Sequence, residues 1–467
     1  MFRFSILLFF FIGYLGSLIG QSTYVIVDDI LIIGNKKTKN YIIKRELTFA
    51  EGDTLPIIEL AEAIPQSERN LLNTQLFNTV SINIIDWNTQ ESRVVIEIQV
   101  GEAWYIFPAP IFELADRNFN VWWVEQHRAL NRINLGLRLK YRNFTGNADE
   151  LKTTFQFGYT QKYEINYLYP YINNKLTLGI EGNLLYAQNR ELAYQSIDNK
   201  LVFHRDDDEL LFQRFRAKLG LKYRPNIFAT HVFRIEHHRN NVSATVPNRL
   251  NPEFFGAGRS NLQFHVLEYE FEYDEHDLRI YPQDGFAIRT KIRRQGILPG
   301  DDVQNWVFRL EGDQYFRFSP YVSLGTYGLG QLTTNLDQLN YFQYRALGYD
   351  NDYVRGYEYY VVDGKSFALW KNKLKWMIFN RDLDMARWTP FKAMKAMPAR
   401  LYLTTGFDLG YVEDPLFSEK NPLTNQWLCG QTVGLDLMVY NNLVYTVELS
   451  RNHLNEYGVY LHFNVRL

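Results

Sequence analysis

The stretch YGVYLHFNVRL, residues 457–467, decides the fold of this chain. Its odd-numbered positions are apolar or aromatic, and its even-numbered positions hold Gly458, Tyr460, His462, Asn464 and Arg466. Side chains of a β-strand point alternately to opposite faces, so one face of this segment is apolar and the other is polar. A soluble protein rarely leaves such an apolar stripe bare. A strand between lipid and a watery interior has this pattern.

The same alternation recurs along residues 104–467 and predicts sixteen strands. In one of them, Arg214, Arg216 and Lys218 alternate with Phe215, Ala217 and Leu219. Only a β-strand would place the basic residues on one face and the apolar residues on the other. The expected spans are 104–114, 131–142, 150–160, 162–169, 175–187, 210–224, 228–240, 260–274, 284–296, 303–318, 320–334, 365–379, 399–412, 428–440, 442–451 and 456–467. An even number of strands is the rule for bacterial single-chain barrels. The chain is therefore predicted to be mainly β, a 16-stranded antiparallel transmembrane β-barrel.

The composition favours an outer-membrane barrel and excludes several other classes. Phe, Tyr and Trp make up 16% of the chain, while the mean hydropathy is only −0.30. This combination fits a barrel in which every second residue is polar. The balance of 50 basic against 52 acidic residues argues against a dedicated nucleic-acid binder. The single cysteine, Cys429, excludes an intrachain disulfide and any site built from several cysteines.

Two further regions precede the predicted barrel. Residues 1–20 have a short basic start, an apolar run and a small-residue end, which predicts a secretory signal peptide; the alternative is a retained anchor. Residues 22–101 form a predicted domain with the order β-α-α-β-β, whose second helix is expected to kink or break at Pro65. Such an α+β domain leaves a sheet edge open to a partner.

The lengths of the connections between the predicted strands also follow the pattern of a barrel. If the N-terminal domain is periplasmic, the connections on the outer side are mostly long and those on the periplasmic side are mostly tight turns. The exception is 380–398, where apolar residues recur at helical intervals. This segment is expected to be a short interfacial piece on the periplasmic rim, or else a plain loop.

A domain of this order followed by sixteen strands resembles the BamA/TamA family of outer-membrane assembly and translocation proteins, whose periplasmic modules are POTRA domains. The POTRA pattern is matched by Gly34, Asn35, Thr38, Arg45, Glu46, Leu47, Gly52 and Asp53, and later by Leu76, Phe77 and Val80. The family's turn after the eighth strand is matched by Tyr273, Asp274, Asp277, Tyr281, Pro282 and Gly285. His276 stands where the family has Arg, so the contacts of that Arg are not carried over.

The sharpest match is Val354-Arg355-Gly356-Tyr357, in the long connection between the eleventh and twelfth strands. The resemblance implies that this loop folds back into the barrel and that its Arg pairs with an acid on the inner wall. The family's Asp-x-Gly on the thirteenth strand is Asp408 and Gly410 here, but Gly406 replaces the usual aromatic residue. The family's acid on the twelfth strand is replaced by Lys371, Lys373 or Lys375.

Strand parity supports the same pairing independently. Leu401, Leu403, Phe407 and Leu409 share one face of the thirteenth strand, so Asp408 points to the other face, into the interior. A charge-assisted bond from Arg355 to Asp408 would then hold the loop inside. We call this predicted arrangement the loop latch; its residues are Arg355, Gly356, Tyr357, Asp408 and Gly410. The alternative is an exposed Arg on a solvated loop.

The sequence contains no pattern of a catalytic, cofactor or metal site. There is no Gly-x-Ser-x-Gly nucleophile elbow and no phosphate-binding Gly-x-x-x-x-Gly-Lys-Ser/Thr run. His237 and His238 are adjacent on a predicted strand and so point to opposite faces, which prevents them from binding one ion together. We therefore expect no enzyme, no cofactor and no metal.

The first and last predicted strands are expected to meet at a weak seam that includes Trp104, Pro108, Pro110, Phe463 and Leu467. A proline cannot donate a ladder hydrogen bond, so this seam is expected to open more easily than other strand pairs. The alternative is that the two prolines only mark the start of the strand.

These features suggest an insertase of the Gram-negative outer membrane, with its POTRA domain in the periplasm. Its expected partners are outer-membrane lipid, unfolded client polypeptides and periplasmic or lipoprotein accessory subunits, with no nucleic acid. A client would add a strand to the POTRA sheet and then to the opened seam. The alternatives are a translocator that moves a polypeptide through the barrel and a plain porin.

Overall fold

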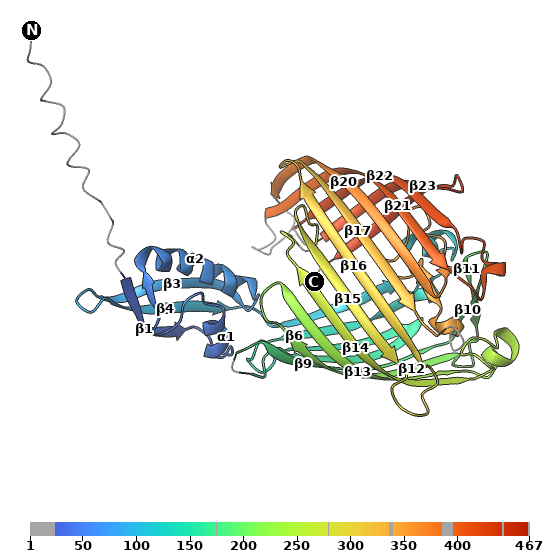
Figure 1. The fold of residues 1–467 in the computed structure, drawn as a ribbon, viewed down its shortest axis with the longest axis horizontal. Coiled ribbons are helices and arrows are strands. Elements are labelled where there is room, and N and C mark those ends of the chain that lie inside the picture. The colour runs from blue at the N-terminus through green and yellow to red at the C-terminus, as the bar shows by residue number, and fades with distance from the viewer. Residues whose placement is uncertain are drawn as a thin grey trace, which may run out of the picture. The chain divides into compact units, whose positions relative to one another are not determined.

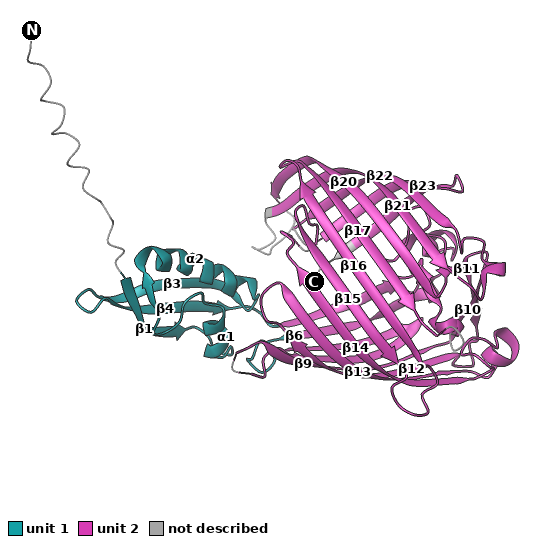
Figure 2. Ribbon diagram, viewed as in Figure 1, with its two compact units in different colours: residues 1–105, 142–148 teal, residues 106–141, 149–467 magenta. Residues whose placement is uncertain are grey.

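The structure is a computed structural model that describes residues 24–173, 175–278, 280–335, 340–384, 396–440 and 443–465 (Figure 1). The chain forms two compact units (Figure 2). The first holds residues 1–105 and 142–148, and the second holds residues 106–141 and 149–467. The predicted signal peptide, residues 1–20, lies outside the described residues, as does Leu467 of the predicted seam.

The first unit is an α+β domain with one four-stranded sheet. Its elements are β1 (Tyr24–Ile33), α1 (Asn40–Arg45), β2 (Thr54–Pro56), α2 (Ile57–Asn73), β3 (Phe77–Asn88) and β4 (Arg93–Glu102). The sheet order is β2-β1-β4-β3, which makes the long strand β3 an edge. The sequence missed the short strand β2, and α2 continues through Pro65 rather than ending there. No helix in the described part of the chain has the length and apolar character needed to span a membrane.

A carboxylate ties the loop before α1 to the end of β4. Glu102 Oε1 accepts hydrogen bonds from the Thr38 amide at 2.6 Å and the Thr38 hydroxyl at 2.7 Å, and the Lys37 amide donates at 3.0 Å. The Thr38 hydroxyl also lies 3.0 Å from the Tyr105 hydroxyl, and it accepts a hydrogen bond from Asn143. Burial raises the pKa of Glu102, but these hydrogen bonds outweigh it and hold the pKa below its ordinary value.

This arrangement predicts an acid-sensitive first unit. Because the pKa of Glu102 is lower in the folded state, its contribution to stability is present above about pH 4.3, the ordinary pKa of Glu, and is lost as the pH falls through the folded value. Hydrogen exchange of residues 36–40, corrected for intrinsic rates, should therefore lose protection at low pH in the native protein. In Glu102→Gln the protection should be lower at neutral pH and nearly independent of pH. Equal protection in the two proteins at every pH would contradict the assignment.

The second unit is a barrel wall of sixteen antiparallel strands in sequence order. They are β5 (Ile106–Leu114), β6 (Ile133–Arg142), β7 (Glu150–Gly158), β8 (Thr160–Tyr169), β9 (Leu178–Asn189), β12 (Phe212–Tyr223), β13 (Ala229–Val242), β14 (Asn261–Asp274), β15 (Gly285–Gln295), β16 (Asn305–Arg317), β17 (Val322–Thr333), β20 (Ser366–Asp384), β21 (Ala396–Glu413), β22 (Trp427–Val439), β23 (Leu443–Asn452) and β24 (Tyr457–Val465). All sixteen predicted strands are present, with most ends within three residues of the expected spans.

The burial of the wall is the reverse of that of a soluble protein. Large apolar side chains such as Leu219 and Val433 are 61% and 55% exposed on its outer face. Polar and charged side chains such as Glu236, Glu268 and Asp436 are buried on the inner face. An apolar exterior around a polar interior is what a strand between lipid and an aqueous lumen requires, so the prediction of a transmembrane barrel is confirmed.

The structure corrects the prediction for residues 380–398. β20 continues to Asp384 and β21 begins at Ala396, so both ends of the predicted interfacial segment belong to strands that pair with each other. The apolar residues that suggested helical intervals fall mostly within 385–395, which lies outside the described residues. The paired ends are extended because a strand ladder satisfies their backbone groups.

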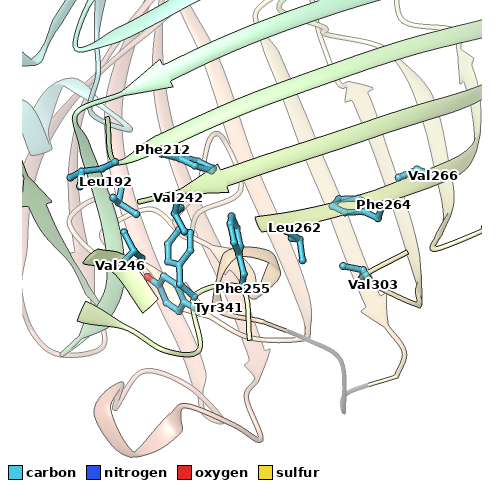
Figure 3. Packing of buried hydrophobic residues seen from close by; sticks show 12 residues of the cluster. Leu192, Phe212, Val242, Val246, Phe255, Leu262, Phe264, Val266, Val303 and Tyr341 are labelled. Atoms are coloured by element: carbon cyan, nitrogen blue, oxygen red, sulfur yellow. The ribbon is translucent and has the colours of Figure 1, made fainter. Parts of the chain in front are cut away.

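The long connections contain structure that the sequence did not predict. Residues 188–209 include a hairpin of β10 (Glu191–Ile197) and β11 (Lys200–Arg205), and residues 115–130 include the short helix α3 (Phe119–Val124). A buried apolar cluster joins β10 to a connection that contains the π-helix Val246–Leu250 (Figure 3). Phe212, Phe255 and Tyr341 belong to this cluster. The β10–β11 hairpin and the connection between β13 and β14 therefore pack against each other.

Candidate functional site

The candidate site lies in the connection between β17 and β20, of which residues 334–335 and 340–365 are described; the site is formed by residues 340–365. We call these residues the inner loop. It contains a 3-10 turn (Tyr341–Gln343) and the two short strands β18 (Arg345–Leu347) and β19 (Val362–Asp363), which pair with each other. Leu347, Val354 and Tyr357 are buried in an apolar cluster with Leu369 of β20 and Leu428 of β22. The loop is thus packed against side chains of the wall rather than solvated.

The structure brings Arg355 and Asp408 together. The guanidinium donates to both oxygens of the carboxylate, with a distance of 2.8 Å from Nε to Oδ2, and the Arg355 amide donates to the same Oδ2 at 3.0 Å. Arg355 Nη2 also donates to the carbonyl of Asn372 in β20, at 2.7 Å. Asp408 is fully buried. Burial lowers the pKa of Arg355, but the Asp408 carboxylate outweighs it, so the pKa lies above its ordinary value.

Glycines on two wall strands make room for the inner loop. A Cβ atom at Gly406 of β21 would lie 2.6 Å from the Arg355 guanidinium, and one at Gly430 of β22 would lie 1.9 Å from the Arg355 carbonyl oxygen. At Gly410 a Cβ would lie 2.5 Å from a methyl group of Val354. The absence of the family's aromatic residue at Gly406 therefore has a physical reason, because the guanidinium occupies that space.

Gly356, Tyr357 and Glu358 fix the tip of the inner loop. Gly356 has φ +90°, a conformation that favours glycine, and its carbonyl accepts a hydrogen bond from Asn452 at 3.0 Å. Its amide donates to Glu358 Oε2 at 2.8 Å. The Tyr357 hydroxyl bonds to His453 in the turn between β23 and β24. Glu358 is buried, and this burial raises the pKa of its carboxyl group.

Residues that follow the first strand of the wall also bind the inner loop. The Arg117 guanidinium donates to the carbonyls of Gly348, Tyr359 and Tyr360 at 3.2, 2.6 and 2.7 Å. The Asn118 amide group donates to the carbonyl of Glu358 at 2.8 Å. These two residues follow β5, the first strand of the wall. The sequence prediction missed both residues because they bind backbone carbonyls more than 200 residues away, and no local pattern marks such a contact.

The loop therefore touches both ends of the strand order. Arg117 and Asn118 follow β5, while β24 contributes His462, whose Nδ1 lies 3.2 Å from the Tyr353 hydroxyl, and Tyr460, whose ring lies 5.5 Å from that of Tyr359. β5 and β24 are the first and last members of the sixteen-stranded sheet. The inner loop thus contacts both the segment that follows β5 and the last strand, β24.

The lysines of β20 do not take part in the loop latch. Lys373 pairs with Asp436 of β22 at 2.7 Å, and Lys375 donates to the carbonyl of Pro282 at 2.7 Å. Lys371 lies over the ring of Tyr353, with Nζ 4.2 Å from its centroid. Asp408 therefore binds Arg355 directly, and the three lysines have other partners.

The predicted turn motif at 273–285 reaches into the interior. Asp277 Oδ1 accepts hydrogen bonds from the amides of Leu278, Gln283 and Asp284, which closes the turn. His276, which stands where the family has Arg, lies between Asp274 and Asp313, at 3.0 and 2.6 Å. Gly285 has φ +99°, and a Cβ there would lie 2.4 Å from the Glu275 carbonyl oxygen.

Tyr281 and Pro282 of the same turn, which joins β14 to β15, contact the later strands β20 and β22. The Tyr281 hydroxyl donates to Asp436 of β22 at 2.6 Å, and the Pro282 carbonyl accepts from Lys375 of β20. A cavity of about 960 Å³ is lined by this turn and by Asp352 and Arg355 of the inner loop. The interior of the second unit is thus partly filled by two inward segments.

The predicted seam residues are placed as follows. The prediction that Trp104 belongs to the first strand is wrong, because β5 begins at Ile106 and Trp104 belongs to the first unit. Pro108 and Pro110 lie within β5, opposite Leu139 and Leu137 of β6, in a register without a shift. Because they are two residues apart, their missing donors point to the same side of β5. The Phe463 ring of β24 lies 6.4 Å from that of Phe119 in α3.

The predicted POTRA residues shape the first unit. Gly34 has φ +92°, and a Cβ there would lie 2.0 Å from the Val100 carbonyl oxygen. The Asn35 side chain donates to the carbonyl of Thr38 at 2.8 Å. Gly52 has φ +89°, its amide donates to the carbonyl of Val27, and Arg45 and Glu46 form an ion pair at the end of α1. The motif therefore defines turns and loops of this domain.

Comparisons with known proteins agree with this architecture. Residues 25–103 match the POTRA domain, described as a surface antigen variable number repeat, and residues 143–384 match the Omp85 superfamily domain. BamA from Haemophilus ducreyi lacking POTRA domains 1–3 is similar in structure, with a TM-score of 0.60 and 12% identity over 94% of this chain and 84% of that chain. CdiB from Escherichia coli has a TM-score of 0.58 and 13% identity over 94% and 76% of the two chains. No curated protein sequence matches.

Proposed function

Because the chain belongs to the Omp85 superfamily of outer-membrane proteins with periplasmic POTRA domains, we propose that it assembles β-barrel client polypeptides into the outer membrane of a Gram-negative bacterium. The observation that carries this proposal is the inner loop, which contacts residues beside β5 and residues of β24. Release of this loop would remove contacts from β24 and from the segment after β5 at once. The end strands could then part and offer an edge to a client strand.

The two prolines of β5 support a seam that opens. Proline is confined to edge strands and bulges because it has no amide to donate. Pro108 and Pro110 keep the register with β6, so the side of β5 that lacks these donors is best assigned to the seam. We propose that few backbone bonds cross the seam near these residues and that the inner loop supplies much of the remaining attachment.

The edge of the first unit offers a docking place for an unfolded client. β3 is an edge strand of twelve residues, and Ile84, Ile85 and Trp87 near its end are exposed. A client strand added there would gain backbone hydrogen bonds that do not depend on its sequence, together with apolar contacts. The assembly reaction would need no nucleotide, since the free energy comes from strand pairing and from burial of client side chains in lipid.

This docking place yields a prediction. The double variant Ile85→Lys with Trp87→Lys should slow client assembly at least about tenfold, because each buried apolar side chain contributes about 1.5–3 kcal/mol to binding and lysine on an edge opposes pairing. The measurement is the folding rate of a urea-unfolded eight-stranded barrel in vesicles that contain the purified protein. The matched control is Ile58→Lys on α2, where the side chain is 67% exposed but lies on no sheet edge. Equal rates for the double variant and the control would contradict the proposal.

A translocator is the second candidate, and the cavity of about 960 Å³ favours it. An extended polypeptide could pass there if both inward segments moved. The vesicle experiment separates the two functions. An assembly factor leaves the client folded in the bilayer, whereas a translocator delivers it to the opposite side, where an enclosed protease would cut it. Deletion of residues 22–101 should abolish client folding, and unchanged folding would remove the assembly proposal.

A further inference from the structure

Three potential metal ligands from distant parts of the chain meet beside the inner loop. Glu358 comes from the loop, Glu448 from β23 and His462 from β24, and one ligand atom of each lies within 4.8 Å of the others. Glu358 and Glu448 are 1% and 2% exposed. Strand parity places Glu448 and His462 on the inner face, where Glu448 pairs with Tyr460 and His462 pairs with Thr446 in the ladder. The sequence pattern does not indicate that Glu358 of the inner loop joins them.

The hydrogen bonds around this cluster leave its facing atoms without hydrogen-bond partners. Glu358 Oε2 accepts from the Gly356 amide, whereas Glu358 Oε1 has no hydrogen bond within the described part of the chain. Glu448 Oε1 and His462 Nε2 are in the same condition. Nε2 lies 3.2 Å from Glu448 Oε1 and 3.7 Å from Glu358 Oε1, so the three atoms face one another in a charged contact of poor hydrogen-bond geometry. Buried oxygens of this kind are costly without a cation.

The hydrogen bonding of the His462 ring favours Nε2 as a metal ligand. His462 Nδ1 lies 3.2 Å from the Tyr353 hydroxyl, and an Nδ1–H that donates to this hydroxyl leaves the lone pair on Nε2. Cationic side chains near the cluster have other partners, because Arg355 pairs with Asp408, Lys373 pairs with Asp436 and Lys371 lies over the Tyr353 ring. Two carboxylates and a neutral imidazole then carry two negative charges, which one divalent cation cancels.

We propose that Glu358, Glu448 and His462 bind a divalent transition-metal ion, with Zn²⁺ as the preferred ion. Zn²⁺ takes imidazole nitrogen and carboxylate oxygen, and three protein ligands leave a fourth position for water. Ca²⁺ and Mg²⁺ prefer oxygen ligands alone, so the histidine disfavours them. The bound ion would connect the inner loop to the last two strands of the wall. This attachment is separate from the loop latch, whose charges belong to Arg355 and Asp408.

The test uses the purified full-length protein in detergent, stripped with a chelator and titrated with Zn²⁺ by calorimetry and with Co²⁺ by absorption spectroscopy. We expect one Zn²⁺ per chain and a Co²⁺ ligand-field band. Glu448→Gln and His462→Gln should each weaken binding at least about tenfold, the scale of losing a ligand or its support. The control Glu413→Gln removes the same charge from an exposed carboxylate that pairs with Lys365, and it should bind normally.

A second measurement needs no variant and so does not depend on their folding. In the unmodified protein, Zn²⁺ should increase hydrogen-exchange protection in residues 353–360, 444–452 and 457–463 together, and a chelator should reverse the change. A failure of client assembly would leave this result untouched, so the two proposals fail separately. Absence of stoichiometric Zn²⁺ binding, or binding that the two substitutions leave unchanged, would overturn the site and assign the contact to a protonated His462 between two carboxylates.

Discussion

Replacing Arg355 with alanine is expected to free the inner loop and to abolish client assembly. The substitution removes every side-chain bond of the guanidinium and leaves the fully buried Asp408 carboxylate with only the Arg355 amide as a partner from the loop. Breaking a buried pair by removing one partner costs about 3–5 kcal/mol. Since 1.4 kcal/mol is tenfold in an equilibrium constant, the equilibrium constant for docking of the loop would fall more than about a hundredfold.

Two measurements check this prediction. Limited proteolysis should cut residues 340–365 in Arg355→Ala but not in the native protein, and the vesicle assay should show little client folding. Arg355→Lys should be intermediate, because lysine keeps the charge but cannot make the two-pronged contact. The matched control is Arg205→Ala, which breaks the exposed pair with Asp207 and a longer contact of 3.9 Å with Glu191. Glu191 keeps its ion pair with Arg132, so this variant should cost no more than about 1 kcal/mol. A protease-resistant loop in Arg355→Ala would contradict the loop latch.

Gly430→Ala is expected to displace the loop without any change in charge. The new Cβ would lie 1.9 Å from the Arg355 carbonyl oxygen, and a backbone atom cannot move aside as a flexible side chain can. Overpacking of this kind costs about 1–3 kcal/mol or more. The docked loop should therefore become protease-sensitive, and client assembly should fall in proportion to the population of undocked loop.

The control for this glycine lies in the same wall. Gly328 of β17 has no other atom within 4 Å of the position that a Cβ would take, so Gly328→Ala should leave both loop protection and assembly unchanged. Equal behaviour of the two alanine variants would show that the close approach at Gly430 does not hold the loop. Loss of the loop contact with full assembly activity would instead separate the latch from the function.

The sixteen wall strands could be predicted from sequence because their signal is local. Each wall strand separates lipid from an aqueous interior, so successive residues of one strand meet opposite environments and alternate in polarity. That alternation predicts Asp408 on the inner face. The short motif around Arg355 then supplied a partner, and the structure brings the two residues together.

The remaining contacts of the site depend on tertiary structure. No local pattern links Arg117 and Asn118 to carbonyls of the inner loop, or Glu358 to Glu448 and His462. The sequence predicts 188–209 only as a connection and does not indicate the hairpin of β10 and β11, because its buried contacts come from residues far along the chain. The alternating pattern extends to Trp104, although β5 begins only at Ile106. The pattern therefore wrongly predicts Trp104 as a residue of the first strand and of the seam.

The sequence by itself thus determined the strands and their inward and outward faces, because neighbouring positions of a barrel wall meet opposite environments. The resemblance of residues 354–357 to the family motif indicated Arg355 as the partner of Asp408. Only the tertiary structure decided what the inner loop contacts. Those contacts join residues up to about 240 positions apart, such as Arg117 and Tyr360, and they exist only after the wall has curved and the loop has entered it.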